Sequence, residues 1–86
     1  MEYQVSIKPN AEKELKRIPK QDYYRILSAF TVLSRDPFIG KKLEGKFKGA
    51  YSYSVWPYRI IYEIHKKELV VLIIRIGHRQ GVYKKI

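Results

Sequence analysis

Side chains suited to work on a phosphodiester gather near the end of the chain, in the segment RIGHRQGVY at 75–83. The segment holds Arg75, His78, Arg79 and Tyr83 around two glycines. Cutting RNA without a metal ion requires a base for the 2′-hydroxyl proton, a cation for the phosphorane and an acid for the leaving 5′-oxygen. Arginine suits the second role, because its planar fork holds two phosphate oxygens and stays protonated. The segment is therefore either a catalytic corner or a basic, solvated tail.

The candidates for proton transfer are fewer. Tyr83 could serve as acid, base or stacking platform, or it could be an ordinary surface tyrosine, one of eight in the chain. His78 suits acid–base work near neutral pH, but alternation along a strand directs it away from Arg79 unless a glycine bulge intervenes. Glu63 is a lone carboxylate that could act as a base, although an ion pair with Arg75 or a nearby lysine is the simpler interpretation.

Length and composition predict one small cytosolic domain spanning residues 1–86. The absence of cysteine excludes disulfides, thiolate zinc sites and a thiol nucleophile. Two separated histidines and scattered carboxylates argue against a metal site. The longest apolar run, at 69–74, is too short to span a membrane, and the acidic, alternating N-terminus does not resemble a signal peptide.

The charge is large and uneven. The chain has 18 Lys and Arg against 8 Asp and Glu, a net charge of +10, of which residues 41–86 carry +8 and residues 1–40 only +2. A surplus of this size attracts phosphate backbones or an acidic protein partner. Besides Arg75, the predicted RNA contacts in the basic half are Lys41, Lys42, Lys46 and Lys48.

The N-terminal half reads as one strand followed by two helices. Alternating apolar side chains at 3–7 predict a strand with one buried face. A helix capped by Asn10 follows, and Pro19 must end it, because the residue before a proline avoids the helical conformation. The second helix shows a clear apolar stripe: Tyr23, Ile26, Leu27, Phe30 and Leu33.

Three strands follow, at 50–55, 58–64 and 68–77. A two-residue turn at Trp56-Pro57 would place Val55 opposite Tyr58, and proline in its second central position indicates a cis bond or a longer loop.

A second loop over Lys66, Lys67 and Glu68 would place His65 opposite Leu69.

In this register Arg59 lies opposite Arg75, and with Arg79 they share the sheet face that the helices leave uncovered. That face would also hold Ile61 opposite Ile73, with Val71 nearby, which makes it an apolar floor with a basic rim. The fold class is α+β, in the order β-α-α-β-β-β. The sheet is expected to be small, mainly antiparallel and four-stranded, with both N-terminal helices packed on one face.

Three segments in this order resemble the RelE/ParE toxin superfamily, over essentially the whole chain: DPFIGKKLEGKFKGAYSYSV, YRIIYEI and RIGHRQGVY. The tyrosine after GHR is more similar to the RelE branch, whose members cleave mRNA, than to the ParE branch, whose members poison DNA gyrase. The resemblance implies a metal-independent ribonuclease without cofactors that cuts mRNA in the ribosomal A site. It also implies an acidic antitoxin that silences the toxin, and operator DNA as a ligand of the pair.

Position by position, the resemblance makes Arg59, Arg79 and Tyr83 the catalytic residues. Two further basic positions of RelE-type toxins fall on Ser52 and Ser54, where this chain has no charge. Lys46 and Lys48 immediately precede that strand, and we consider them as replacements for the missing cations.

The leading hypothesis is a toxin that cleaves mRNA by attack of the 2′-hydroxyl. Two alternatives remain: a ParE-like inhibitor of gyrase that is not a nuclease, and a nucleic-acid-binding module that has lost its catalytic activity. The two uncharged serines favour the gyrase inhibitor, whereas the arginine pair with Tyr83 argues against it.

Overall fold

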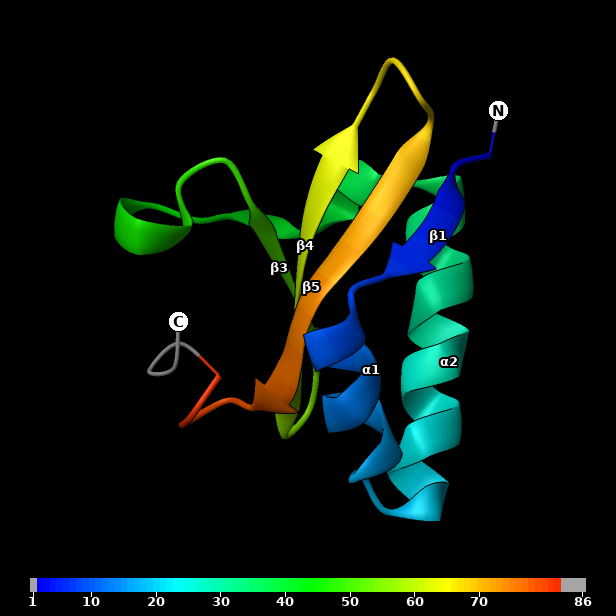
Figure 1. Ribbon diagram of the computed structural model, residues 1–86, viewed down its shortest axis with the longest axis vertical. Coiled ribbons are helices and arrows are strands. Elements are labelled where there is room, and N and C mark those ends of the chain that lie inside the picture. Colours follow the sequence, from blue (N-terminus) through cyan, green and yellow to red (C-terminus); the bar gives the residue numbers. More distant parts are fainter. Residues whose placement is uncertain (1, 83–86) are drawn as a thin grey trace.

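A five-stranded mixed sheet carries both long helices on one of its faces (Figure 1). The computed structural model describes residues 2–82. The strands lie in the order β1-β5-β4-β3-β2, with β1 parallel to β5 and the other neighbours antiparallel. The elements are β1 (Gln4–Ile7), α1 (Pro9–Lys16), α2 (Lys20–Arg35), η1 (Pro37–Ile39), β2 (Lys41–Lys42), η2 (Gly45–Phe47), β3 (Tyr51–Val55), β4 (Tyr58–His65) and β5 (Val70–His78). No helix in this part of the chain is long and apolar enough to cross a membrane.

The two helices confirm most of their prediction. The helical region breaks between α1 and α2 at Pro19, as expected. The predicted Asn10 cap is wrong, because Lys8 occupies the N-cap and Pro9 the first helical position, which suits its fixed φ and missing N–H. The apolar stripe of α2 belongs to the main core, in which the buried residues of the two helices are Ala11, Leu15, Ile26, Ala29, Phe30 and Leu33.

The sheet has one strand more than the four predicted. β2 consists of two lysines, and Lys41 pairs with Ser52 of β3 while Lys42 pairs with Tyr51. Two consecutive lysines have neither the alternation nor the apolar content that marks a strand in a sequence. Their extended conformation follows from pairing with β3, a tertiary contact that the local sequence does not predict.

The β3–β4 hairpin has the predicted register. Val55 lies opposite Tyr58 and Tyr53 opposite Ile60, so that apolar side chains share the face under the helices. The peptide bond between Trp56 and its proline at the tip is cis, one of the two arrangements that the sequence allowed.

The loop between β4 and β5 is one residue longer than predicted. His65 lies opposite Val70, not opposite Leu69. Leu69 belongs to the loop, where it has a φ of 57°, a left-handed conformation that residues other than glycine rarely adopt. Because no glycine marks this position, the sequence pattern predicts a loop that is one residue too short.

A bulge in β5 changes the predicted register a second time. Tyr62 pairs with Ile73 and Ile61 with Arg75, so Ile74 is the extra residue between two successive pairs. Without the bulge, strict alternation would place Arg75 on the same face as Ile73, in the core under the helices. Burying a charge there is costly, and the bulge avoids this by turning Arg75 to the opposite face.

The sheet face opposite the helices, which we call the open face, is less apolar than predicted. Val71 and Ile73, expected on it, belong to the main core under the helices. The open face keeps a smaller cluster, in which Ala50, Ile61 and Val82 are buried. It is therefore a partly apolar surface, as expected, but with a different membership.

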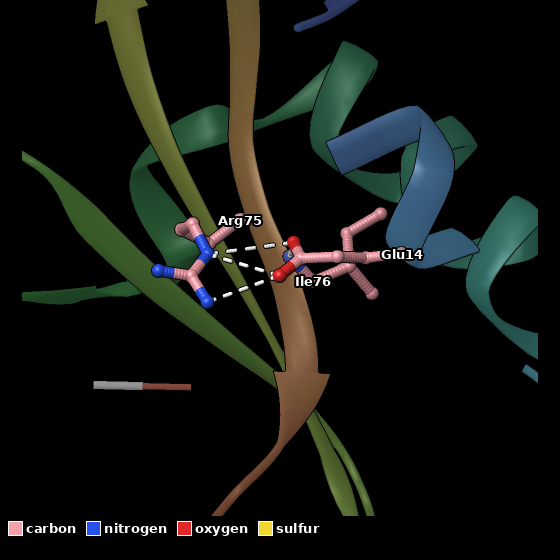
Figure 2. A network of polar contacts seen from close by, with 3 residues as sticks. All are labelled: Glu14, Arg75 and Ile76. Atoms are coloured by element: carbon pink, nitrogen blue, oxygen red, sulfur yellow. Dashed lines mark hydrogen bonds and ion pairs between the residues drawn. The ribbon is translucent and has the colours of Figure 1, made fainter. Parts of the chain in front are cut away.

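One carboxylate joins α1 to the edge of β5 (Figure 2). β1 pairs with only the first part of β5, and α1 lies beside the rest. There Glu14 accepts a 2.9 Å hydrogen bond from the backbone N–H of Ile76, and its Oε2 lies 3.1 Å from Nε and 3.0 Å from Nη2 of Arg75. The ion pair considered for Arg75 and Glu63 does not form, since Glu63 pairs with His65 at 3.0 Å.

Tyr62 is fully buried, and its hydroxyl donates a 2.7 Å hydrogen bond to the carbonyl oxygen of Pro37. Gly40 leaves room for this hydroxyl, because a side chain at that position would collide with it. Burial raises the pKa of Tyr62 to about 12. The folded protein therefore holds the neutral phenol.

We predict that removing the Glu14 carboxylate destabilises the fold. Glu14→Ala removes the acceptor shared by the Ile76 N–H and the Arg75 guanidinium, which should lower the free energy of unfolding by about 1–3 kcal/mol. Glu14→Gln keeps an acceptor for the N–H and should lose less. Urea unfolding measures both, with Glu12→Ala, an exposed glutamate of the same helix, as the control. An equal loss in the control would contradict the prediction.

We predict that Tyr62 makes the fold less stable at alkaline pH. Tyrosine in an unfolded chain titrates near about 10, and the folded pKa is about 12. The stability that the neutral Tyr62 phenol contributes is therefore complete below the pKa of the unfolded chain and is lost as the pH rises through the pKa of the folded protein. Across this window the wild type should lose roughly 3 kcal/mol more than Tyr62→Phe in denaturant unfolding. Parallel pH curves for the two proteins would rule this out.

Candidate active site

Arg59 stands on the open face between two small neighbours. It lies opposite Ser54 on β3 and opposite Gly77 on β5, which corrects its predicted pairing with Arg75. Ser54 presents only a short hydroxyl on one side of Arg59, and Gly77 carries no side chain on the other. Within residues 2–82, no carboxylate forms an ion pair with Arg59. This cation is thus available to an external anion.

Arg79 is held at the end of the same ladder. Its backbone N–H donates a 2.8 Å hydrogen bond to the carbonyl oxygen of Pro57, so it stays opposite Pro57 just beyond the last residue of β5. Because Arg59 is opposite Gly77, the two arginines are diagonal neighbours across the strands, a relation that separates such positions by roughly 7–8 Å. The guanidinium carbon of Arg79 lies 4.4 Å from the ring centroid of Trp56.

Arg75 lies on the open face, as predicted, but it has a structural partner there. Its guanidinium contacts Glu14 and its side chain is only 15% exposed. We therefore do not include Arg75 among the proposed RNA contacts.

His78 lies on the face opposite Arg59. It is paired with Tyr58, and the two rings meet edge to face with their centroids 6.3 Å apart. Burial, and then the nearby Asp22 carboxylate, raise the pKa of Tyr58, which keeps this neighbour neutral. The Nδ1 atom of His78 accepts a 3.3 Å hydrogen bond from the backbone N–H of Gln80. Alternation along the strand predicted this placement, which separates His78 from the arginine pair.

All four predicted lysine contacts are exposed, but they lie in different places. Lys41 of β2 is in register with Ser52, so both belong to the open face. Lys46 and Lys48 lie in and after η2, the green turn that projects away from the sheet on the side opposite the helices (Figure 1). The lysine beside the uncharged Ser52 is therefore Lys41, and not Lys46 or Lys48 as we had considered.

After β5 the chain folds back over the open face. The backbone N–H groups of Gly81 and Val82 both donate 2.9 Å hydrogen bonds to the carbonyl oxygen of His78. Val82 is buried in the open-face cluster, and its side chain lies 3.4 Å from the place of a Cβ on Gly77. Tyr83, the third predicted catalytic residue, is outside the described residues.

Two features of the site escaped the sequence analysis. The first is the register of Lys41, which depends on a strand too short to recognise. The second is the contact of Trp56 with Arg79, which joins a hairpin tip to the segment after the last strand. For the second feature, the sequence indicated only a tryptophan beside a proline in a predicted turn. It did not indicate that Arg79 would contact this tryptophan.

Comparison with known proteins identifies the family. The family model for the ParE toxin of type II toxin–antitoxin systems matches residues 5–83. The chain belongs to the RelE/ParE toxin family. It is thus a toxin of a type II toxin–antitoxin system.

Three relatives are similar to this toxin over nearly its whole length. Toxin RelG of Mycobacterium tuberculosis is 31% identical over 99% of this chain and 100% of its own. A toxin–antitoxin complex from that organism, RelBE2, contains a chain that is 31% identical with a TM-score of 0.85, over 92% of this chain and 100% of that one. The archaeal RelE–RelB complex of Pyrococcus horikoshii contains one that is 30% identical with a TM-score of 0.80, over 95% and 100%.

We predict that Lys41 contributes more to RNA affinity than Lys46. Lys41 lies on the open face with the two arginines. Lys41→Ala should therefore remove one phosphate contact and lower the slope of log affinity against log salt concentration by about 0.7 for single-stranded RNA. Fluorescence polarisation with a labelled, uncleavable oligonucleotide measures the slope. Lys46→Ala, an equally charged change in the projecting turn, should leave it unchanged. Equal slopes for the two variants would refute the difference.

Proposed function

We propose that this toxin is a ribosome-dependent, metal-independent mRNA endonuclease that an acidic antitoxin neutralises. The observation that carries the proposal is the pair Arg59 and Arg79, which are diagonal neighbours on the open face. The cross-strand neighbours of Arg59 are Ser54 and Gly77, and among the described residues no carboxylate pairs with either arginine. Two guanidinium groups so placed can hold the oxygens of one phosphate.

The proposed reaction is an attack of RNA on its own backbone. The 2′-oxygen bonds to phosphorus, the bond to the 5′-oxygen breaks, and the products are a 2′,3′-cyclic phosphate and a 5′-hydroxyl. Arg59 and Arg79 would stabilise the extra negative charge of the phosphorane. Tyr83 is proposed to assist proton transfer or to stack on a base.

The position of His78 supports a role for the ribosome. The imidazole lies on the other face of the sheet, and the positions that carry further cations in RelE-type toxins are Ser52 and Ser54 here. The open face thus offers charge stabilisation more clearly than proton transfer. We infer that alignment of the 2′-hydroxyl depends on how the ribosome presents the mRNA.

An acidic antitoxin is the proposed regulator. The similar chains from M. tuberculosis and P. horikoshii are described in toxin–antitoxin complexes. The net charge of +10 and the partly apolar open face suit a partner that is acidic and amphipathic. We also propose that the pair binds operator DNA and that the toxin acts in the cytoplasm.

Inhibition of DNA gyrase is the second candidate function. Ser52 and Ser54 favour it, because a toxin that only binds its target does not need cations at those positions. A module that binds nucleic acid without cutting it is the third candidate.

We predict that purified toxin cuts mRNA within codons at the A site of translating ribosomes, and that excess EDTA does not prevent it. Arg79→Ala and Arg59→Ala should each lower the rate by about 10²–10³-fold, as expected for loss of a group that stabilises developing charge. Primer extension measures the cuts. Arg35→Ala is the matched control, because Arg35 is exposed and lies on α2, away from the open face.

Three outcomes would overturn the proposal. Cuts that persist in both arginine variants would place the chemistry elsewhere. The absence of cuts at high toxin concentration, together with inhibited gyrase supercoiling, would establish the second candidate function. If neither reaction changes although RNA binds, the third candidate holds.

A further inference from the structure

The hairpin between β3 and β4 ends in an exposed indole that contacts a candidate catalytic arginine. Trp56 is 58% exposed, an unusual state for the largest apolar side chain. The Arg79 guanidinium lies over its ring at 4.4 Å, within the range of a cation–π contact. The backbone bond from Arg79 to Pro57 fixes the two segments together. The indole is thus an exposed aromatic surface directly beside a guanidinium that is proposed to bind phosphate.

A shallow hollow opens beside another part of Trp56. It has a volume of about 410 Å³ and lies between α2 and the outer edge of β3. Val32, Tyr53 and Trp56 are among the residues that line it, and so is Arg25, which forms an ion pair with Asp22 at 3.0 Å. Arg79 does not line this hollow. An aromatic ligand could therefore meet the indole from this side while Arg79 keeps its own contact.

We propose that Trp56 is a base-stacking site for single-stranded RNA, which receives the nucleobase next to the phosphate held by Arg79 and Arg59. This inference rests on the proposed function, since it uses the same arginines. Aromatic side chains bind single strands by stacking on base faces, and adjacent cations hold the backbone. The hairpin supplies Trp56 and Arg59, and the segment after β5 supplies Arg79.

The exposed indole beside the two arginines favours RNA over an acidic peptide. Both ligands would satisfy Arg59 and Arg79, but only RNA has a flat aromatic base on the same nucleotide as each phosphate. A carboxylate side chain has no surface that matches an exposed indole. A peptide that docked here would gain from the arginines and gain little from Trp56.

The chain itself contains the probe for a test, because Trp56 is its one tryptophan. Titration with a short 2′-O-methyl oligouridine, which cannot be cleaved, should quench the Trp56 fluorescence and reach saturation. The same oligomer without bases should bind through its phosphates and leave the fluorescence almost unchanged. A polyglutamate peptide should likewise give little quenching. An equal response to all three ligands would overturn the inference in favour of a purely electrostatic site.

Affinity measured by fluorescence polarisation separates stacking from an indirect effect on Arg79. Trp56→Ala should weaken binding of the oligouridine by roughly 5- to 150-fold, the range for one stacked base. Trp56→Phe should fall between that variant and the wild type, since it keeps an aromatic face. For the oligomer without bases, Trp56→Ala should bind as the wild type does. An equal loss with that oligomer would mean that Trp56 acts by positioning Arg79, which contradicts the proposed stacking.

The matched control is Tyr24→Ala, which removes a side chain of similar exposure, 56%, from the surface of α2. It should change neither the affinity nor the quenching of Trp56. A loss as large as that of Trp56→Ala would show that any exposed aromatic group serves, and would overturn a specific site.

Failure of this inference is distinguishable from failure of the proposed function. Quenching that requires the bases, in a toxin that cuts no mRNA on ribosomes, would leave the stacking site standing and remove the nuclease. Ribosomal cleavage by Trp56→Ala at the wild-type rate, with unchanged RNA affinity, would do the reverse.

Discussion

The bulge at Ile74, together with the carboxylate of Glu14, sets the positions of the side chains at the end of β5. Val71 and Ile73 must face the helices, and so must Ile76. A regular strand cannot satisfy this, because the third of these residues has the wrong parity. One extra residue restores the match, and Glu14 then supplies the acceptor that the N–H of Ile76 lacks beyond the end of β1. The cost of an irregular strand is offset by a charge-assisted hydrogen bond and an ion pair.

This arrangement determines the candidate active site. The bulge shifts Arg75 beside Glu14 and brings Gly77, not an arginine, opposite Arg59. Two guanidinium groups directly opposite one another would repel. A glycine there lets Val82 return over the open face. The same shift carries Arg79 to the hairpin tip, where it meets Trp56.

Sequence patterns predicted the parts of this protein that depend on neighbours along the chain. The stripe of α2, the break at Pro19 and the register across the two-residue turn of β3–β4 all follow from local spacing. The assignment of Arg59 and Arg79 to one face was also made from alternation along the strands. Predictions failed where a distant contact decides the conformation. Leu69 has a left-handed φ although it is not a glycine. Lys41 is in an extended strand only because it pairs with β3.

The sequence by itself determined the α+β class and the strong positive charge, because periodicity and composition encode them residue by residue. Its motifs indicated the family, and the resemblance to that family supplied the candidate roles of Arg59 and Arg79. The tertiary structure alone decided which arginine is free to bind an anion and which is held by Glu14. It also decided which lysine stands beside Ser52 and where Trp56 lies. These outcomes depend on the pairing of segments far apart in the chain, Glu14 with Arg75 and Trp56 with Arg79, and no local pattern specifies such a pairing.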